Sequence, residues 1–141
     1  MFDEADLRIV KLLQENSRMS WKEIGEHVHL TGQAVGNRIR RLEEAGVIEQ
    51  YTVALNEAKL GRTVTAFITV LMKSANHTAF QAFIEKEEII AEAHRISGDG
   101  CYFLKAHTTS LEELDALLNR ILKHGNYRVS LSIGKLKPSF P

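Results

Sequence analysis

The sequence predicts an α+β fold in two parts, a group of three short helices followed by a small sheet with its own helices. The first part is indicated by residues 20–46, where capping residues and apolar spacing mark two short helices joined by a tight turn. The second is indicated from residue 62 onward, where strand-like segments alternate with helical periodicity in the order β-α-β-β-α-β. Each part of the 141-residue chain is close to the size at which an isolated core is marginal, so a second copy would add buried surface.

The first two helices are recognised by their caps. Asp3 can cap a helix over residues 4–16, and its inward side chains are expected to be Leu7, Val10 and Leu12 or Leu13. The second helix begins at Ser20-Trp21-Lys22-Glu23, a capping box in which serine and glutamate satisfy each other's backbone amides. Its apolar face is marked by Ile24 and Val28.

The third helix has one apolar side and one side rich in amides and arginines. Thr31 caps it, Gly46 is placed to end it, and its buried stripe is Val35, Ile39 and Leu42. An α-helix turns by about 100° per residue. The side chains that point away from the stripe are therefore Gln33, Asn37 and Arg40, with Arg41 on a flank and Arg38 near the stripe's edge.

This arrangement predicts a helix that enters the major groove of DNA. Amide side chains read adenine bidentately, and guanidinium groups contact guanine edges or phosphates. We expect the two amides at base edges, Arg40 at bases or backbone, and the other two arginines at phosphates, with one more phosphate at the helix start. The predicted contacts are Thr31, Gln33, Asn37, Arg38, Arg40 and Arg41. A solvated arginine face is the alternative, but the helix-turn-helix pattern around it favours DNA binding.

The connection between the two parts contains a predicted strand. Residues 47–53 have β-type composition, which gives the N-terminal part a winged-helix-like character. Gly61 is a breaker, and residues 56–61 are the best boundary. We therefore expect a helix-turn-helix domain over residues 1–50, a β segment and linker over 51–61, and a second domain over 62–141.

The second domain is predicted to be ferredoxin-like. The expected strands are residues 63–73, 89–97, 101–108 and 127–136, with residues 98–100 as a turn. The first helix opens at Asn76, and its apolar side chains are Ala79, Phe80, Phe83 and Ile84. The second opens at a capping box beginning with Ser110, ends at Gly125, and turns inward Leu114, Leu117, Leu118 and Ile121. The βαββαβ order is that of a ferredoxin-like split unit.

The first strand of this domain is apolar on both faces. Val64, Ile68 and Met72 lie on one face, and Phe67 and Leu71 lie on the other. Two helices can cover only one face of such a sheet, so we expect a homodimer to bury part of the other. A two-fold protein would require two DNA half-sites about one helical turn apart.

The charge balance and the single cysteine limit the function classes. With 18 basic and 18 acidic residues the chain is not a nonspecific polycation, so affinity for DNA would come from the basic third helix. One cysteine excludes an internal disulfide framework and suits a reducing cytosol. The N-terminus lacks the features of a signal peptide, and no apolar run is long enough to span a bilayer. We therefore expect a cytoplasmic protein.

An enzyme or a metal protein is the alternative from another class. Cys101 and His107 share a strand face, but six residues of strand rise separate them by about 20 Å. His94 on the neighbouring strand could approach Cys101, although no third group is placed to orient the pair. The six histidines show no i, i+4 pair, so neither a metal nor a cofactor is expected.

Short motifs recur in a fixed order along nearly the whole chain. They include Asp6-Leu7, Arg18-Met19-Ser20, Glu23-Ile24-Gly25, Leu30-Thr31, Arg38-Ile39-Arg40-Arg41-Leu42-Glu43, Gly46-Val47-Ile48, Tyr51-Thr52, Leu60-Gly61 and Ala66-Phe67. This ordered set resembles the Lrp/AsnC family of leucine-responsive, or feast–famine, transcriptional regulators. The resemblance implies an N-terminal DNA-binding domain and a C-terminal domain that dimerises, often assembles into octamers, and often binds an amino acid between dimers.

The resemblance also implies an effector site, where this chain departs from the family. The family's loop commonly reads G-x-x-D-Y, and the corresponding residues here are Gly98, Asp99, Gly100, Cys101 and Tyr102. A thiol does not supply the charge that an aspartate offers to the ammonium group of an amino acid. Asp99 could substitute from the loop, so amino-acid binding remains open. His29 is a second departure, because it stands in a turn where the family commonly has glycine.

The sequence thus predicts a sequence-specific, oligomeric transcriptional regulator, modulated by an amino acid or another small effector. The alternative with the same fold is an architectural protein that bends or wraps DNA with little sequence preference and no effector.

Overall fold

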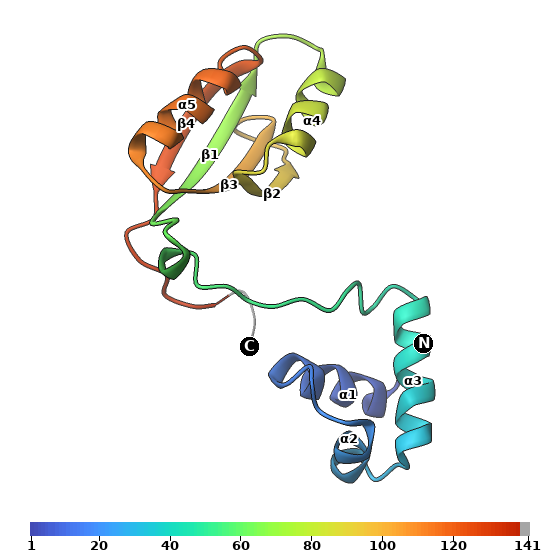
Figure 1. Ribbon diagram of the computed structural model, residues 1–141. Coiled ribbons are helices and arrows are strands. Elements are labelled where there is room, and N and C mark those ends of the chain that lie inside the picture. Colours follow the sequence, from blue (N-terminus) through green and yellow to red (C-terminus); the bar gives the residue numbers. More distant parts are fainter. Residues whose placement is uncertain (139–141) are drawn as a thin grey trace. The chain divides into compact units, whose positions relative to one another are not determined.

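The computed structural model describes residues 1–138 (Figure 1). The chain divides into two compact units, one of residues 1–54 and one of residues 55–136. The division falls just before the predicted linker boundary of 56–61. The last three residues of the predicted 62–141 domain lie outside the described part.

The N-terminal unit consists of α1 (Glu4–Glu15), α2 (Trp21–Val28) and α3 (Gly32–Glu44). Each helix begins with a side-chain cap, since Asp3, Ser20 and Thr31 accept bonds from backbone amides three residues ahead. The α2 cap is the serine half of the predicted capping box. The buried residues that join the three helices are Ile9, Leu12, Ile24, Val35 and Ile39.

The inward face of α1 differs from the one predicted. Leu7 is 61% exposed, whereas Ile9 and the carboxylate Asp6 are fully buried. The face is set by Asp6, which forms ion pairs with α3, as described below. Apolar spacing alone does not show that a charged residue will be buried, and this is why the prediction was wrong for Leu7.

The strand predicted for residues 47–53 is wrong. After α3 the chain is irregular as far as a short 3₁₀ helix, Ala58–Leu60, and Tyr51, Val53 and Leu55 are exposed. The amides of Val47 and Ile48 instead bond to the Leu42 carbonyl at the end of α3. A strand forms only when its backbone groups pair with a neighbouring strand, and residues 1–138 provide none for this segment.

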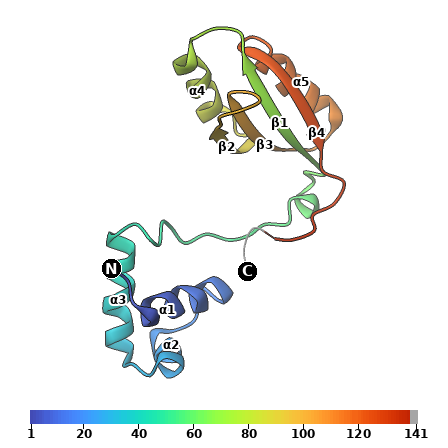
Figure 2. The same cartoon turned by 180° about the vertical axis from the view of Figure 1, so that it is seen from behind.

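The C-terminal unit confirms the predicted βαββαβ order. Its elements are β1 (Val64–Met72), α4 (His77–Lys86), β2 (Ile90–Arg95), β3 (Tyr102–Thr108), α5 (Leu111–Ile121) and β4 (Gly125–Leu131). All pairings are antiparallel, and the strand order is β2-β3-β1-β4. Both helices lie on the same face of the sheet (Figures 1 and 2).

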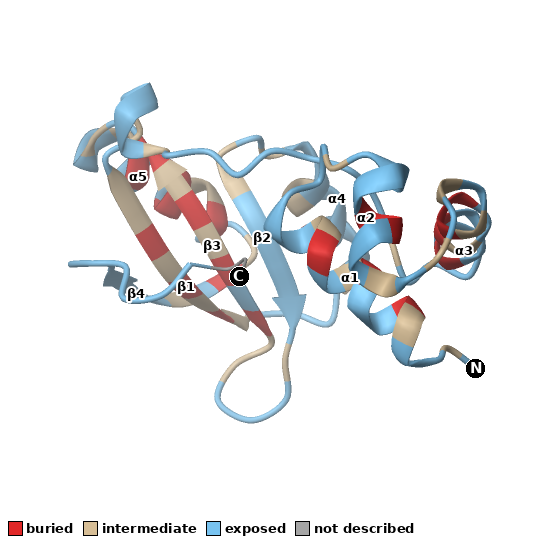
Figure 3. Cartoon of the chain, turned by 90° about the horizontal axis from the view of Figure 1, so that it is seen from below, coloured by how far each residue is buried: buried red, intermediate tan, exposed pale blue. Residues whose placement is uncertain are grey.

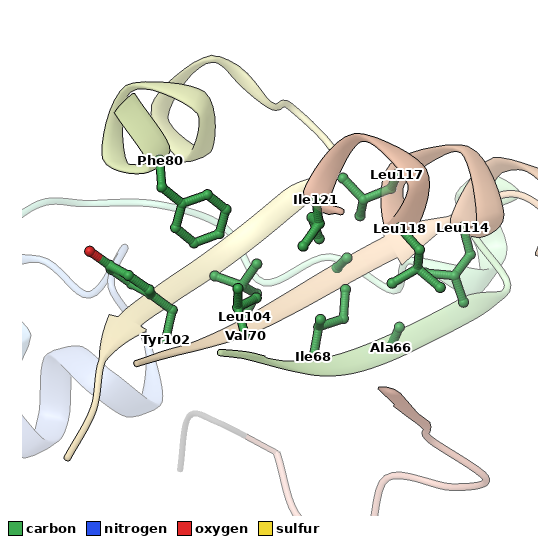
Figure 4. Packing of buried hydrophobic residues seen from close by; sticks show 11 residues of the cluster. Ala66, Ile68, Val70, Phe80, Tyr102, Leu104, Leu114, Leu117, Leu118 and Ile121 are labelled. Atoms are coloured by element: carbon green, nitrogen blue, oxygen red, sulfur yellow. The ribbon is translucent and has the colours of Figure 1, made fainter. Parts of the chain in front are cut away.

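The core of this unit lies between the sheet and its two helices. Figure 4 shows Phe80 of α4 and four residues of α5 directed toward the central strands. The α5 residues are the predicted Leu114, Leu117, Leu118 and Ile121, all buried. Along β1 and β3, buried residues alternate with less buried ones, while β2 is mostly exposed (Figure 3). Each fully buried Leu or Ile side chain contributes roughly 1.5–3 kcal/mol.

Gly125 does not end α5 as predicted. The last helical residue is Ile121, and Gly125 is the buried first residue of β4, next to β1. A Cβ at Gly125 would lie 2.4 Å from the carbonyl oxygen of Leu71. The glycine is therefore required by close backbone approach between strands. β4 also ends at Leu131, short of the predicted 136, and Ile133 is fully exposed.

Gly125→Ala is expected to destabilise the C-terminal unit by about 1–3 kcal/mol, because the strands must move apart to admit the methyl group. Gly134→Ala is the matched control, since nothing lies within 4 Å of a Cβ there. Unfolding in urea is monitored by hydrogen exchange at the β1 amides, which belong to the C-terminal unit and report on that unit alone. Equal stability of the two variants would contradict the close approach.

Candidate functional site

The exposed side of α3 carries the predicted polar residues. Gln33, Asn37 and Arg40 are exposed, whereas Val35 and Ile39 on the opposite side are buried. The predicted outward orientation of the three polar side chains is confirmed. Thr31 is exposed and accepts a bond of 3.1 Å from the Ala34 amide at the start of α3.

The turn between α2 and α3 depends on His29, which follows the last residue of α2, and on Gly25 within α2. His29 has a φ of 60° and thus the left-handed conformation that its turn position requires. The Leu30 amide bonds to the Gly25 carbonyl at 3.0 Å. A Cβ at Gly25 would lie 2.3 Å from the Leu30 oxygen, so only glycine permits this close turn. The two helices are therefore held at a defined angle by backbone contacts.

Two of the three arginines on α3 bind carboxylates of the N-terminal segment. Arg38 Nη1 donates to Asp3 Oδ1 at 2.7 Å and to Asp6 Oδ1 at 3.0 Å. Arg41 Nη2 donates to Asp6 Oδ2 at 3.1 Å. Asp6 is fully buried, and both of its oxygens are bonded. These bonds tie the start of α1 to the middle of α3.

These ion pairs also lower the pKa of the exposed Asp3 carboxylate. Hydrogen bonds from the Arg38 guanidinium and the Asp6 amide hold the pKa of Asp3 at about 2, below its ordinary value of 3.8. The sequence showed acidic residues before α1 and basic residues on α3, but not their pairing. The residues that sequence reasoning missed are thus Asp3 and Asp6 as partners of Arg38 and Arg41. Their opposite charges on neighbouring helices were the available signal.

Arg40 has different surroundings. Its Nη1 donates to Asn37 Oδ1 at 3.0 Å, and its guanidinium lies 5.4 Å from the centre of the Trp21 ring. Trp21 of α2 therefore contacts a predicted DNA-binding residue of α3.

The predicted effector loop joins β2 and β3. Gly98 and Gly100 have positive φ values of 103° and 108°, as tight turns require. Asp99 is exposed at the loop, and Cys101 is half-buried, with its amide bonded to the Val70 carbonyl at 2.8 Å. Tyr102 turns into the core, where its hydroxyl lies 2.8 Å from His77 Nδ1. The five residues are contiguous, but the tyrosine hydroxyl is occupied within the domain.

The two residues of the enzyme alternative lie on β2 and directly before β3. His94 pairs across the sheet with Phe103, and the Ile96 amide donates to the Cys101 carbonyl. Among residues 1–138, no group of three His, Cys, Asp or Glu side chains converges as a metal site. In the same part of the chain, no helix is both long and apolar enough to cross a bilayer.

The sheet face opposite the helices is partly apolar. Phe67 of β1 and Phe103 of β3 stack with ring centres 6.1 Å apart, and Phe103 is 37% exposed. Thr65 Oγ1 lies 2.9 Å from His107 Nδ1 on the same face. Burial of the imidazole lowers the pKa of His107, and the nearby Glu57 carboxylate partly opposes this.

Comparison with known proteins assigns both units. The AsnC-type helix-turn-helix domain matches residues 2–43, and the Lrp/AsnC ligand binding domain matches residues 65–141. The HTH-type transcriptional regulator LrpB of Bacillus subtilis (strain 168) is 46% identical over 138 residues, which cover 98% of this chain and 93% of LrpB. The chain belongs to the Lrp/AsnC family.

Solved Lrp/AsnC-type structures have the same fold. LrpC of B. subtilis superposes with a TM-score of 0.93 at 30% identity, covering 97% of this chain and 98% of that one. A transcriptional regulator of Neisseria meningitidis, solved as a complex with L-Met, gives a TM-score of 0.91 at 26% identity, covering 98% and 94%. This Lrp/AsnC chain is therefore an HTH-type transcriptional regulator that binds DNA, and the architectural alternative is not favoured.

The lowered pKa of Asp3 predicts a pH dependence for the N-terminal unit. A carboxylate whose pKa falls on folding stabilises the fold above its unfolded pKa, and that stabilisation is lost as the pH falls from about 4 to about 2. Asp3→Asn keeps a capping side chain but removes the charge. We expect this variant to be less stable than the parent at pH 6 and equally stable near pH 2, measured by Trp21 fluorescence during urea unfolding. Parallel stability curves over this range would contradict the ion pair.

Proposed function

We propose that α3 lies in the DNA major groove, with Gln33 and Asn37 at base edges and Arg40 at bases or backbone. The observation that carries this proposal is the exposure of these three side chains on the side of α3 opposite its buried stripe. Amide and guanidinium groups match the hydrogen-bonding edges of adenine and guanine. In this proposal these three side chains recognise the base sequence of the operator, whereas contacts with phosphates orient the protein on the duplex.

In this proposal Thr31, Arg41 and Arg38 contact phosphates, and they differ in how many hydrogen-bond donors each has available. At the start of α3, the amides beside Thr31 offer donors and the positive end of the helix dipole to one phosphate. Within residues 1–138, Arg41 uses one nitrogen for Asp6 and is 58% exposed, which leaves its other donors for a phosphate. Arg38 is only 25% exposed and binds two carboxylates, so it contacts a phosphate only when the bond to Asp3 opens.

Asn37→Ala and Arg41→Ala should affect DNA binding differently. Loss of the amide should relax sequence preference by about 1–3 kcal/mol at one base position. Loss of the Arg41 charge should weaken all sequences alike and lower the salt slope by about one. Binding assays over a panel of duplexes at several salt concentrations separate the two effects. Arg18→Ala, an exposed arginine outside α3, is the matched control. Identical behaviour of the two α3 variants would refute this division of roles.

We infer that the open sheet face joins two copies of the chain. The stacked Phe67 and Phe103 rings give it an apolar centre that the chain's own helices leave uncovered. Burying such a patch in a second, identical patch removes it from water and generates two-fold symmetry. Assembly of dimers into octamers is what the family leads us to expect. A two-fold dimer presents two α3 helices to two half-sites of one operator.

Phe103→Glu is expected to convert the dimer to a monomer, because two carboxylates would meet at the apolar centre. Light scattering at micromolar concentration measures the mass directly. Leu111→Glu is the matched control, since Leu111 is exposed on α5 and lies in the helical layer of the unit. A parent protein that is itself monomeric, or a variant that remains dimeric, would contradict this interface.

We also propose that a small effector, an amino acid in the simplest case, binds at the loop formed by Gly98–Tyr102. The ligand-binding domain match and the L-Met complex of the Neisseria relative support this. Asp99 is exposed and can supply the charge that Cys101 lacks. Binding between dimers would bias how they assemble, and this would change the spacing of the DNA-binding units.

Calorimetric titration with the twenty amino acids tests the effector directly. If Cys101 occupies an ammonium-binding position, Cys101→Asp should tighten amino-acid binding by about tenfold, equal to about 1.4 kcal/mol. Cys101→Ser is the matched control, because it changes the atom without adding charge. Flat titrations for the parent and for both variants would remove the amino-acid hypothesis.

A further inference from the structure

The Trp21 side chain of α2 lies directly against the backbone of α3 at Gly36. A Cβ at Gly36 would come within 2.4 Å of Cζ3 and 2.5 Å of Cε3 of the indole ring. Real Cβ atoms do not approach other atoms so closely. The ring can therefore occupy this place only because residue 36 is glycine, although Gly36 lies in mid-helix, where glycine is unfavourable.

This ring and one amide hold the Arg40 guanidinium in place. The guanidinium lies over the ring at 5.4 Å, within the range of cation–π attraction, and Nη1 donates to Asn37 Oδ1. Both contacts are local to the exposed surface of α2 and α3. Trp21 itself is 42% exposed, so much of the indole remains outside the core.

The chemistry of these contacts leaves Arg40 able to bind a ligand. Arg38 and Arg41 are paired with carboxylates, which offset their charges. In residues 1–138, Arg40 pairs with a neutral ring and a neutral amide and with no carboxylate, so its charge is not offset. Stacking uses one flat face of a guanidinium, whereas hydrogen bonds are donated from its edges. The Arg40 donors that Asn37 does not use therefore remain available to a ligand while both contacts are made.

We propose that Trp21, seated on Gly36, is a positioning residue that orders Arg40 before DNA arrives. The proposal rests on the proposed place of Arg40 at the DNA. An arginine that is already ordered loses less side-chain entropy when it binds a base edge or phosphate than a free arginine does. Trp21 acts through Arg40 and requires no contact of its own with the bases.

A double-mutant cycle on the full chain tests the coupling. The probe is a duplex selected by the parent protein from a random pool, with sonicated bulk DNA as the nonspecific reference. Trp21→Ala should weaken binding to the selected duplex by about two- to fivefold, the range of an exposed cation–π contact. The same change should have no effect in an Arg40→Ala background. Trp21→Phe keeps an aromatic face and should restore most of the affinity.

Two measurements without DNA accompany the cycle. Trp21 is the single tryptophan, so its emission reports on the stack, and Arg40→Ala should shift that emission in the free protein. Gly36→Ala should lower Tm in the parent, because it displaces the ring. In the Trp21→Ala background it should raise Tm, because alanine is then the better helix former.

The outcomes separate this proposal from the DNA-binding one. Additive effects of Trp21→Ala and Arg40→Ala on affinity would overturn the positioning role while leaving the DNA contact of Arg40 intact. The positioning role would also fail if Trp21 emission were unchanged by Arg40→Ala. A parent protein that selects no duplex would overturn the proposed placement of α3 at DNA, and the positioning role with it.

Discussion

The buried carboxylate of Asp6 is the interaction on which the geometry of the DNA-binding unit depends. It accepts bonds from Arg38 and Arg41 and links α1 to the helix that carries the proposed base contacts. A buried charge is tolerated only when it is paired, so α1 and α3 must hold one relative orientation for Asp6 to remain bonded. The apolar residues between the helices provide the burial, and the carboxylate determines which faces meet. The orientation of α3 is therefore specified by charge as well as by packing.

The C-terminal unit depends on a different constraint, because its two helices cover one face of a four-stranded sheet. The covered face contains the core, with Ile68, Val70 and Leu104 fully buried. The uncovered face keeps aromatic rings that a soluble monomer has little reason to retain. The fold that stabilises this unit therefore also leaves a surface suited to the proposed association of two copies.

Local patterns were sufficient to predict most of the elements. The caps at Ser20, Thr31 and Ser110 and the stripe from Leu114 to Ile121 are short-range features, and each lies where it was predicted. The errors came where long-range contacts decide. Leu7 is exposed because Asp6 is buried, the segment 47–53 has no neighbouring strand, and Gly125 is required by the backbone of Leu71. The outward side of α3 was predicted from helical geometry, but the carboxylates that bind Arg38 and Arg41 are more than thirty positions away.

The irregular segment after α3 has a mechanical consequence. Six residues, 49–54, run without regular structure between the last backbone bonds of the helical unit and the start of the sheet unit. Fully extended, such a tether spans at most about 22 Å. In the two-fold assembly proposed above, the length of this tether would limit how far each DNA-binding unit can lie from its own sheet unit.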